Sequence, residues 1–402
     1  MSDLHSSISE FPESGSGKGN LKVAIVHDWL PVYAGAERVL EQMILEYPQA
    51  EVFTLIDLIP EKDRSFLGGC PVHTSFIQRL PFSKKHYRKY VFLAPLAVEQ
   101  FDLTRFDLVL SSSYVVAKAA ITSASQLHIS YVHSPVRYAW DLQFQYLKEL
   151  GLEKGIRSWV FRLILHYLRQ FDVNTVNRVD HFVANSEFVR QRIRKTWNRD
   201  ADVIYPPVDV RRFQTSGTKE EYYITASRLV PYKKIHLIAE AFKSLPDQKL
   251  IIVGDGPEKG RIQKVAGPNV ELRGWVGNEE LSLLLQNAKA FIFAAEEDFG
   301  IAPVEALAAG TPVLAYGKGG ALESVISGKT GRFFDSQSSG SISDAVLNFE
   351  NNGVHYGADE IRQSVLKFAP EEFRTSLRRL IAKSLQEQHS TGVDQSDQSD
   401  QN

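Results

Sequence analysis

Short apolar runs recur along the chain, and most are followed by a polar turn and a segment with the apolar spacing of a helix. In the first half the runs cover residues 21–27, 51–55, 108–110, 129–133, 181–185 and 203–205. In the second half they cover residues 222–226, 250–254, 270–272, 290–294 and 312–315. Continuous apolar runs of this length are typical of strands buried on both faces of a parallel sheet. The pattern therefore predicts alternating strands and helices.

Two adjacent prolines, Pro206 and Pro207, divide this alternation into two series. Because proline restricts the backbone to extended forms, the pair suits a semi-rigid linker. We predict an α/β protein of two doubly wound, Rossmann-like domains that face each other across a cleft. The N-terminal domain is expected at residues 21–205 and the C-terminal domain at residues 206–365.

The ends of the chain give three further predictions. Residues 366–385 carry a helical apolar stripe, and we expect this helix to pack back on the N-terminal domain. Residues 1–20 lack the apolar centre of a signal peptide and are expected to form a disordered leader. Residues 386–402 are polar and low in complexity, and they are expected to form a disordered tail.

Composition narrows the function classes. The chain has 402 residues, of which 43% are hydrophobic and 23% charged, as in ordinary globular proteins. The net charge of -2 gives no overall attraction to nucleic acid, so an anion site would be local. The single cysteine, Cys70, excludes an intrachain disulfide and permits the cytosol. No run of about 18 apolar residues predicts a membrane-spanning helix.

The most informative stretch is residues 291–310, FIFAAEEDFGIAPVEALAAG. An apolar strand is followed by an acidic turn and by a helix that starts near Ile301 and stops at Gly310. This order places N–H donors and the positive end of a helix at the carboxyl edge of a sheet, where ligands bind. Glu297 and Glu305 are expected to face one ligand there. Such a site suits a ligand with a phosphate part and a polyhydroxyl part, and a nucleotide sugar has both.

Two cations precede this stretch at the same predicted edge. Arg228 lies just after the end of a predicted strand, and Lys233 follows in a short loop before a predicted helix. An arginine fork and a lysine point charge would stabilise the charge that develops on a departing diphosphate. The alternative is that both are solvated loop residues.

Other features carry weaker signals. His133 ends an apolar strand and is expected to face the cleft, although a lone histidine is more often a core residue. Glycines at 254 and 256 are interpreted as turn residues, and those at 317–320 give weak evidence for a phosphate loop. Asp200-Ala201-Asp202 has the Asp-x-Asp pattern of metal-dependent transferases but is interpreted as a surface turn. No His/Cys cluster has metal spacing, so no metal site is predicted.

Two interpretations remain open for a helical segment in the first half. One helical stripe is formed by the apolar residues Ile156, Trp159, Val160, Leu163, Ile164, Tyr167, Leu168 and Phe171, and the basic residues Arg157, Arg162, His166 and Arg169 lie off it. The segment is either a core-facing helix with a solvated basic face or a contact with an anionic membrane. A second basic and aromatic cluster, residues 84–90, allows the same membrane contact.

Taken in order, these motifs resemble the retaining glycosyltransferases of family 4, of the GT-B architecture. The matching segments are EDFGIAPVEALAAGTPV, SRLVPYKK, GDGPE and GKGGALESV. In the first domain, VHDWLP, GAERV, YVHSPVRYAWD and YPPVD look most like bacterial mannosyltransferases of surface-polysaccharide assembly. The resemblance implies a hexosyltransferase that needs no metal or other cofactor, uses GDP-mannose and extends a glycan or lipid-linked glycan.

The resemblance also implies roles for individual residues. For the diphosphate these are Arg228, Lys233 and Gly35. For the donor sugar they are Glu297, His133 and the backbone at Phe299, Gly300 and Ile301. For the base and ribose they are Arg273, Val276 and Glu305, and for the acceptor side Arg137 and Asp141. Glu296 and Asp298 are expected to face solvent. Two positions depart from the family pattern, because Ala34 and Lys234 stand where glycine is common.

Three alternatives to this function remain. A UDP-sugar could be the donor, as in a sucrose- or trehalose-type synthase, or the protein could bind nucleotide sugars without catalysis. A dinucleotide-dependent oxidoreductase is disfavoured because the segment 33–36 lacks the Gly-x-Gly-x-x-Gly pattern. We expect the protein in the cytoplasm, with peripheral contact to the inner face of the plasma membrane as an open option.

Overall fold

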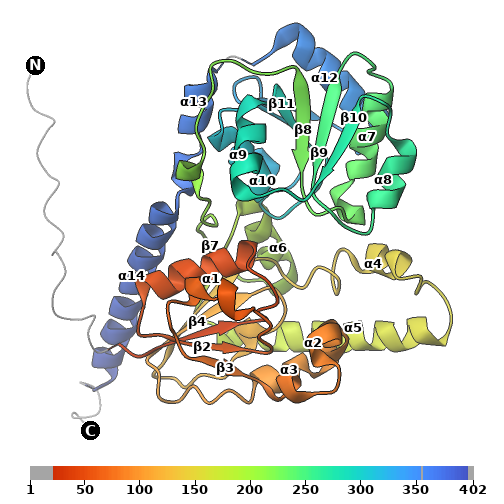
Figure 1. Cartoon of the computed structure of the whole chain (residues 1–402). Helices are drawn as coiled ribbons and strands as arrows, with labels where there is room; N and C mark the ends of the chain where they lie inside the picture. The colour runs from red at the N-terminus through yellow and green to blue at the C-terminus, as the bar shows by residue number, and fades with distance from the viewer. Residues whose placement is uncertain (1–20, 355, 397–402) are drawn as a thin grey trace, which may run out of the picture.

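The computed structural model describes residues 21–354 and 356–396, and it has two α/β domains stacked one above the other (Figure 1). All strands in both sheets are parallel to their neighbours. The predicted fold class, two Rossmann-like domains, is confirmed.

The N-terminal domain has a seven-stranded sheet with the order β3-β2-β1-β4-β5-β6-β7. Its strands are β1 (Val23–His27), β2 (Glu51–Thr54), β3 (Val72–Thr74), β4 (Leu108–Ser113), β5 (Leu127–Val132), β6 (His181–Ala184) and β7 (Asp202–Val203). Its helices are α1 (Gly35–Glu46), α2 (Ser83–His86), α3 (Ala94–Val98), α4 (Gln143–Glu149), α5 (Ile156–Asn174) and α6 (Glu187–Trp197). The apolar side chains of β1 alternate between two core clusters, one on each face of the sheet. This explains its continuous apolar sequence.

The C-terminal domain has a six-stranded sheet with the order β10-β9-β8-β11-β12-β13. Its strands are β8 (Tyr222–Ala226), β9 (Lys249–Val253), β10 (Val270–Gly274), β11 (Ala290–Phe293), β12 (Val313–Tyr316) and β13 (Gly331–Phe334). Its helices are α7 (Ile235–Lys243), α8 (Lys259–Val265), α9 (Asn278–Asn287), α10 (Ile301–Ala308), α11 (Ala321–Ser324), α12 (Ser339–Asn352) and α13 (Ala358–Gln363). Two of the observed strands, β3 and β13, were not predicted, since each is a short edge strand without a long apolar run.

The last helix, α14 (Pro370–Ser396), leaves the C-terminal domain and runs along the N-terminal domain (Figure 1). Phe373, Leu377 and Ile381 belong to the same core cluster as the residues of α1. Arg378 also forms an ion pair with Glu46 of α1, with Nη2 2.6 Å from Oε2. The helix therefore connects the C-terminal domain to the N-terminal domain.

The boundaries at this end of the chain need two corrections. Phe368 and Ala369 belong to the core of the C-terminal domain, so that domain extends past 365. The tail expected to be disordered from residue 386 is helical as far as Ser396. This segment continues a helix whose first part is packed, so it needs no nucleation of its own. Residues 397–402 and the expected leader at 1–20 lie outside the described residues.

No helix within the described residues is long and apolar enough to cross a membrane.

Candidate active site between the two domains

Strand order locates the candidate site. In an open parallel sheet, a crevice forms at the carboxyl ends of the two strands where the direction of winding reverses. This point lies between β1 and β4 in the N-terminal domain and between β8 and β11 in the C-terminal domain. Arg228 directly follows β8, and Glu297 follows β11. The cleft residues predicted from sequence therefore lie at the switch point of their sheet.

Lys233 and Glu297 form an ion pair at this point. Both side chains are mostly buried, with exposed fractions of 15% and 17%. Lys233 ends a short 3-10 turn, and Lys234 follows with a left-handed φ of 58°. That backbone conformation is the reason glycine suits position 234. The geometry singles out Lys233, and not Lys234, as the lysine that contacts the acidic loop.

Arg228 is exposed and forms no ion pair within the described part of the chain. The backbone of its loop packs closely against two glycines of the turn that follows β9, Gly254 and Gly256. A Cβ atom at Gly254 would lie 1.9 Å from the carbonyl oxygen of Ser227, and one at Gly256 would lie 2.3 Å from that of Leu229. These glycines are therefore structural, as interpreted from the sequence. They hold a free guanidinium at the carboxyl end of β8.

The other glycine segment, 317–320, packs against the acidic loop in the same way. A Cβ atom at Gly319 would lie 2.5 Å from the carbonyl oxygen of Glu297, and one at Gly320 would lie 2.3 Å from Cα of Phe299. The N–H of Gly320 donates to the carbonyl oxygen of Glu297 over 2.8 Å. The segment thus supports the backbone of the acidic loop.

Phe299, Gly300 and Ile301 lead from that loop into α10. The side chain of Phe299 is buried in the core of the C-terminal domain, so only its backbone can face a ligand. Gly300 has a φ of 89° at the start of α10. A Cβ atom at Gly35 would lie only 3.1 Å from Cδ1 of Ile301. Gly35 therefore allows the start of α1 to approach the start of α10 across the cleft.

Glu305, on α10, also connects the two domains. Its Oε1 lies 3.2 Å from Nη1 of Arg38 on α1 and 3.4 Å from Nη2 of Arg212 in the linker. Its Oε2 has no hydrogen bond among the described residues, so it is free to accept one from a ligand hydroxyl group.

His133 lies just past the end of β5 in the N-terminal domain. Its Nε2 is 2.8 Å from Oγ of Ser112, and its carbonyl oxygen accepts a 3.0 Å hydrogen bond from Nδ2 of Asn185. Burial, helped by the nearby charge of His27, lowers the pKa of His133 to about 3. The ring is therefore neutral at physiological pH. It can hydrogen-bond a sugar hydroxyl but is a poor general base there.

Asp28 is a site-building residue that sequence reasoning missed. It directly follows β1 and is completely buried. Its two carboxylate oxygens accept four backbone N–H groups, from residues 114–117, over 2.6 to 2.9 Å. The loop it holds carries Tyr114, whose ring lies edge-on to His133. The only sequence signal was an acidic residue at the end of a buried strand.

The expectation that Asp298 faces solvent is wrong. Its side chain is only 16% exposed and contacts the N-terminal domain. Its carboxylate lies 2.5 Å from Nη1 of Arg192 and 3.3 Å from Nη1 of Arg137. Arg192 also pairs with Asp141. Burial raises the pKa of Asp298, and the two arginines oppose that shift.

Arg137 and Asp141, the acceptor-side candidates, therefore belong to an inter-domain ion network. Nε of Arg137 is buried and has no hydrogen-bond partner among the described residues. The acceptor role of these two residues stays a prediction.

Arg273 and Val276, expected near the base, lie on and after the edge strand β10. Arg273 pairs with Glu271 and Glu280, with the shortest distances 2.6 Å and 3.1 Å. Its guanidinium is thus occupied by its own domain. Val276 packs partly buried against the C-terminal core.

Within the described residues, no group of three or more His, Cys, Asp or Glu residues is arranged to hold a metal ion. Asp200 of the Asp-x-Asp pattern pairs with Arg190 and Arg194, both over 2.9 Å. These hydrogen bonds lower the pKa of Asp200. Asp200 is thus engaged in a surface ion network.

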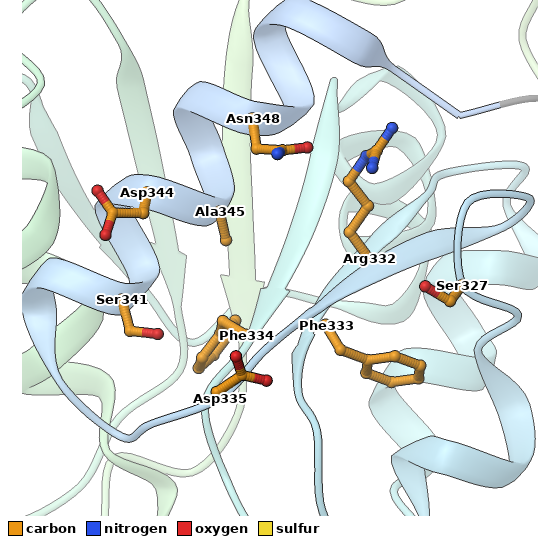
Figure 2. Close-up of a pocket in the computed structure, with 9 residues that line it drawn as sticks. All are labelled: Ser327, Arg332, Phe333, Phe334, Asp335, Ser341, Asp344, Ala345 and Asn348. Carbon is orange, nitrogen blue, oxygen red and sulfur yellow. The ribbon is translucent and has the colours of Figure 1, made fainter.

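A separate hollow of about 340 Å³ lies between β13 and α12 in the C-terminal domain. Figure 2 shows its mixed lining, which includes Asp335, Asp344 and Arg332. None of the candidate site residues lines it, so it is not part of the inter-domain site.

Two family models match the chain, one for each domain. The model "Glycosyltransferase Family 4" matches residues 33–212, and the model "Glycosyl transferases group 1" matches residues 209–367. The two matches meet at the linker after Pro206 and Pro207. The chain belongs to glycosyltransferase family 4 and has the GT-B fold.

Curated relatives match over parts of their length. The α-1,3/1,6-mannosyltransferase alg-2 of Neurospora crassa is 28% identical over 259 residues, which are 50% of this chain and 55% of the relative. A GDP-mannose-dependent α-(1-6)-phosphatidylinositol monomannoside mannosyltransferase of Mycolicibacterium smegmatis is 30% identical over 203 residues, 42% and 53% of the two chains. The matched segment thus spans about half the length of these relatives.

Among solved structures, Anabaena HepE in complex with UDP and glucose superimposes with a TM-score of 0.65. It is 18% identical, and the match covers 90% of this chain and 100% of HepE. This likeness concerns the fold alone.

Proposed function

We propose that the protein is a retaining glycosyltransferase that moves a hexose from a nucleotide sugar to a glycan or lipid-linked glycan. The observation that carries the proposal is the pairing of Lys233 with Glu297 beside the free Arg228, at the start of α10. This places cations for a diphosphate next to a carboxylate for sugar hydroxyls. We assign His133, at the end of β5 in the other domain, to the donor sugar.

The proposed mechanism follows from these charges. The bond between the anomeric carbon and the diphosphate breaks, and negative charge grows on the leaving oxygen. Arg228, Lys233 and the N–H groups at the start of α10 stabilise that charge more in the transition state than in the ground state. The acceptor hydroxyl attacks from the same face and gives its proton to the leaving phosphate oxygen. No carboxylate base, metal or other cofactor is needed for this balance.

We further propose GDP-mannose as the donor. The support is that relatives of this chain are named as mannosyltransferases, one of them GDP-mannose-dependent. A UDP-sugar is the second candidate, because HepE was solved with UDP and glucose.

A donor screen tests the activity. The purified protein is incubated with GDP-mannose, UDP-glucose or UDP-GlcNAc, with and without EDTA, and nucleotide release is measured. We expect release from GDP-mannose that is insensitive to EDTA. Release from none of the donors, together with no binding of any of them, contradicts the function. Loss of release in EDTA contradicts the metal-free mechanism.

We also propose that the enzyme acts at the cytoplasmic face of a membrane, where a lipid-linked acceptor is found. The support is the N-terminal half of α5, because the apolar stripe there is exposed and does not face the core. Ile156 is 81% exposed, Trp159 76% and Leu163 68%. The C-terminal half of the helix packs through Leu165, Leu168 and Phe171, and Phe161 packs beside Leu165.

Exposed positive charge is present in two places, beside this stripe on α5 and, separately, in residues 84–89. Arg157 is exposed beside the stripe on α5. Lys84, Lys85, Arg88 and Lys89 are exposed as well, and none of them has an ion-pair partner within residues 21–354 and 356–396. Exposed cations together with exposed aromatic and aliphatic side chains are the features that an anionic lipid surface attracts.

Co-sedimentation with vesicles of phosphatidylcholine and phosphatidylglycerol tests the contact. Leu163→Ser is expected to weaken binding several-fold at low salt, because it removes apolar area from the proposed surface. Leu347→Ser is the matched control, since Leu347 is 48% exposed on α12 of the other domain. Absence of wild-type binding at low salt, or equal binding by both variants, contradicts the membrane contact.

A further inference from the structure

Asp298 lies between the two domains in a way that the reaction chemistry alone does not require. It neighbours Glu297, but its side chain points to the opposite side of the loop. Glu297 pairs with Lys233 of its own domain, whereas Asp298 pairs with Arg192 and Arg137 of the N-terminal domain. Adjacent side chains of an extended segment alternate in this manner. The direction of one side chain therefore constrains the direction of the other.

The backbone of the same loop is held by the N-terminal domain as well. Oγ of Ser186 donates to the carbonyl oxygen of Asp298 over 2.6 Å, and Nη2 of Arg137 donates to that of Glu296 over 3.4 Å. Ser186 is also the N-cap of α6, since its Oγ accepts the N–H of Val189. One hydroxyl group thus joins the start of α6 to the acidic loop.

Glu323 adds a second contact between the C-terminal domain and the start of α6. Its two carboxylate oxygens accept the N–H groups of Glu187 and Phe188, over 2.9 Å and 3.1 Å. Both N–H groups lie in the first turn of α6 and have no partner within the helix. At the start of α6, two N–H groups therefore donate to the carboxylate of Glu323, and the hydroxyl group of Ser186 donates to the acidic loop of the other domain. These contacts exist only while the two domains lie against each other.

We propose that Asp298 is a positioning residue whose pairing with Arg192 and Arg137 couples closure of the cleft to the placement of Glu297. In the closed arrangement, the two arginines fix Asp298, and Glu297 is held toward Lys233 and the donor sugar. When the domains separate, Asp298 loses both partners and the acidic loop loses its anchors. This inference rests on the proposed function, since it assigns Glu297 to the donor sugar.

The geometry of the ion pair between Arg192 and Asp298 supports a coupling of domain closure to the placement of Glu297, beyond a simple stabilisation of the interface. Arg192 is only 12% exposed, and its other nitrogen pairs with Asp141 of its own domain. The guanidinium is therefore oriented before the second domain arrives. A pre-oriented arginine fork recognises a carboxylate with defined geometry. Two arginines also offset the repulsion between Asp298 and Glu297, which are adjacent in sequence and both acidic.

The test compares Asp298→Asn with Glu296→Gln in the full-length protein. Turnover of the donor found active for the wild type is measured together with the dissociation constant of the matching nucleoside diphosphate. We expect Asp298→Asn to lower kcat by 10-fold to 100-fold and to change the dissociation constant by less than about threefold, since the diphosphate cations are untouched. Glu296→Gln keeps the wild-type values, because its side chain makes no ion pair among the described residues.

A double-mutant cycle separates coupling from a general loss of structure. If Asp298 and Arg192 act through their contact, Arg192→Gln lowers kcat to a similar extent, and the double variant is no slower than the slower single variant. Losses that multiply in the double variant overturn the inference. So does a wild-type kcat in Asp298→Asn, or a nucleotide affinity that falls in parallel with kcat. A wild-type protein without turnover on any donor instead contradicts the proposed function itself.

Discussion

Lys233→Met is the substitution that tests the proposed reaction most directly. It removes the ammonium group that pairs with Glu297 and keeps most of the aliphatic chain. A leaving diphosphate gains about one negative charge as the glycosidic bond breaks. A cation about 4 Å from that charge contributes roughly 4 kcal/mol at an effective dielectric constant of about 20. Part of this attraction already acts on the bound donor, so we expect kcat to fall by about 10²-fold to 10³-fold.

Lys234→Gly is the matched control. It removes the adjacent cation, and glycine adopts the left-handed φ of 58° at this position without strain. We expect kcat within about threefold of the wild type and a small gain in stability, of roughly 0.5–1 kcal/mol. The assay is nucleotide release at saturating donor, with isothermal titration of the nucleoside diphosphate as a separate measure of binding.

Three results with these two variants would contradict the proposed role of Lys233 in the transition state. A near-normal kcat in Lys233→Met removes this lysine from the chemistry, whatever its effect on binding. A large loss in Lys234→Gly with normal turnover in Lys233→Met would assign the phosphate to the other lysine. A loss confined to diphosphate affinity would mean that Lys233 binds the ground state and transition state equally.

Three further outcomes follow from buried groups. Asp28→Asn leaves two of four N–H groups without an acceptor, so urea unfolding followed by tryptophan fluorescence should show a loss of about 3 kcal/mol; a loss below about 1 kcal/mol would contradict the anchoring role. Burial lowers the pKa of His128 from 6.5 to about 4. Stability is then lost as pH falls from 6.5 toward 4, by about 2 kcal/mol at pH 5, because only the unfolded chain binds the proton. His128→Gln should flatten that part of the stability curve, and an unchanged slope would assign it to other groups. Gly320→Ala places a Cβ 2.3 Å from Cα of Phe299 and should reduce both thermal stability and turnover, whereas Gly340→Ala, with no atom within 4 Å, should not reduce either; equal effects of the two would refute the close packing.

The sequence predicted the elements that local patterns define. The predicted alternation of strands and helices is confirmed at α7 and α9, because an apolar face of helical period defines such helices. The strands at both switch points were also predicted, since strands buried on both faces are continuously apolar. Residues at the carboxyl ends of these strands, such as Arg228 and Glu297, could therefore be assigned to the cleft without any coordinates.

What the sequence did not reveal is the set of contacts between the domains. Asp298 was expected in solvent because an acid beside two other acids on a loop usually is. It is buried because Arg192, more than a hundred residues earlier in the chain, lies opposite it once the domains meet. Arg38 and Glu305 are a second such pair. No local pattern specifies a pairing of this kind, since it depends on how two separately folded sheets are oriented.

This difference bears on how the site works. The residues found from sequence alone are those that one domain can place by itself, and in the proposed mechanism they contact the donor diphosphate and sugar. The contacts found only from the structure join the two domains, and two of them are ion pairs, Arg38 with Glu305 beside α1 and Arg192 with Asp298 beside α6. Both carboxylates lie within the acidic loop and helix that carry Glu297. The inter-domain ion pairs therefore converge on the segment that we propose to contact the donor, so an approach of the two domains would act directly on Glu297, the proposed sugar contact.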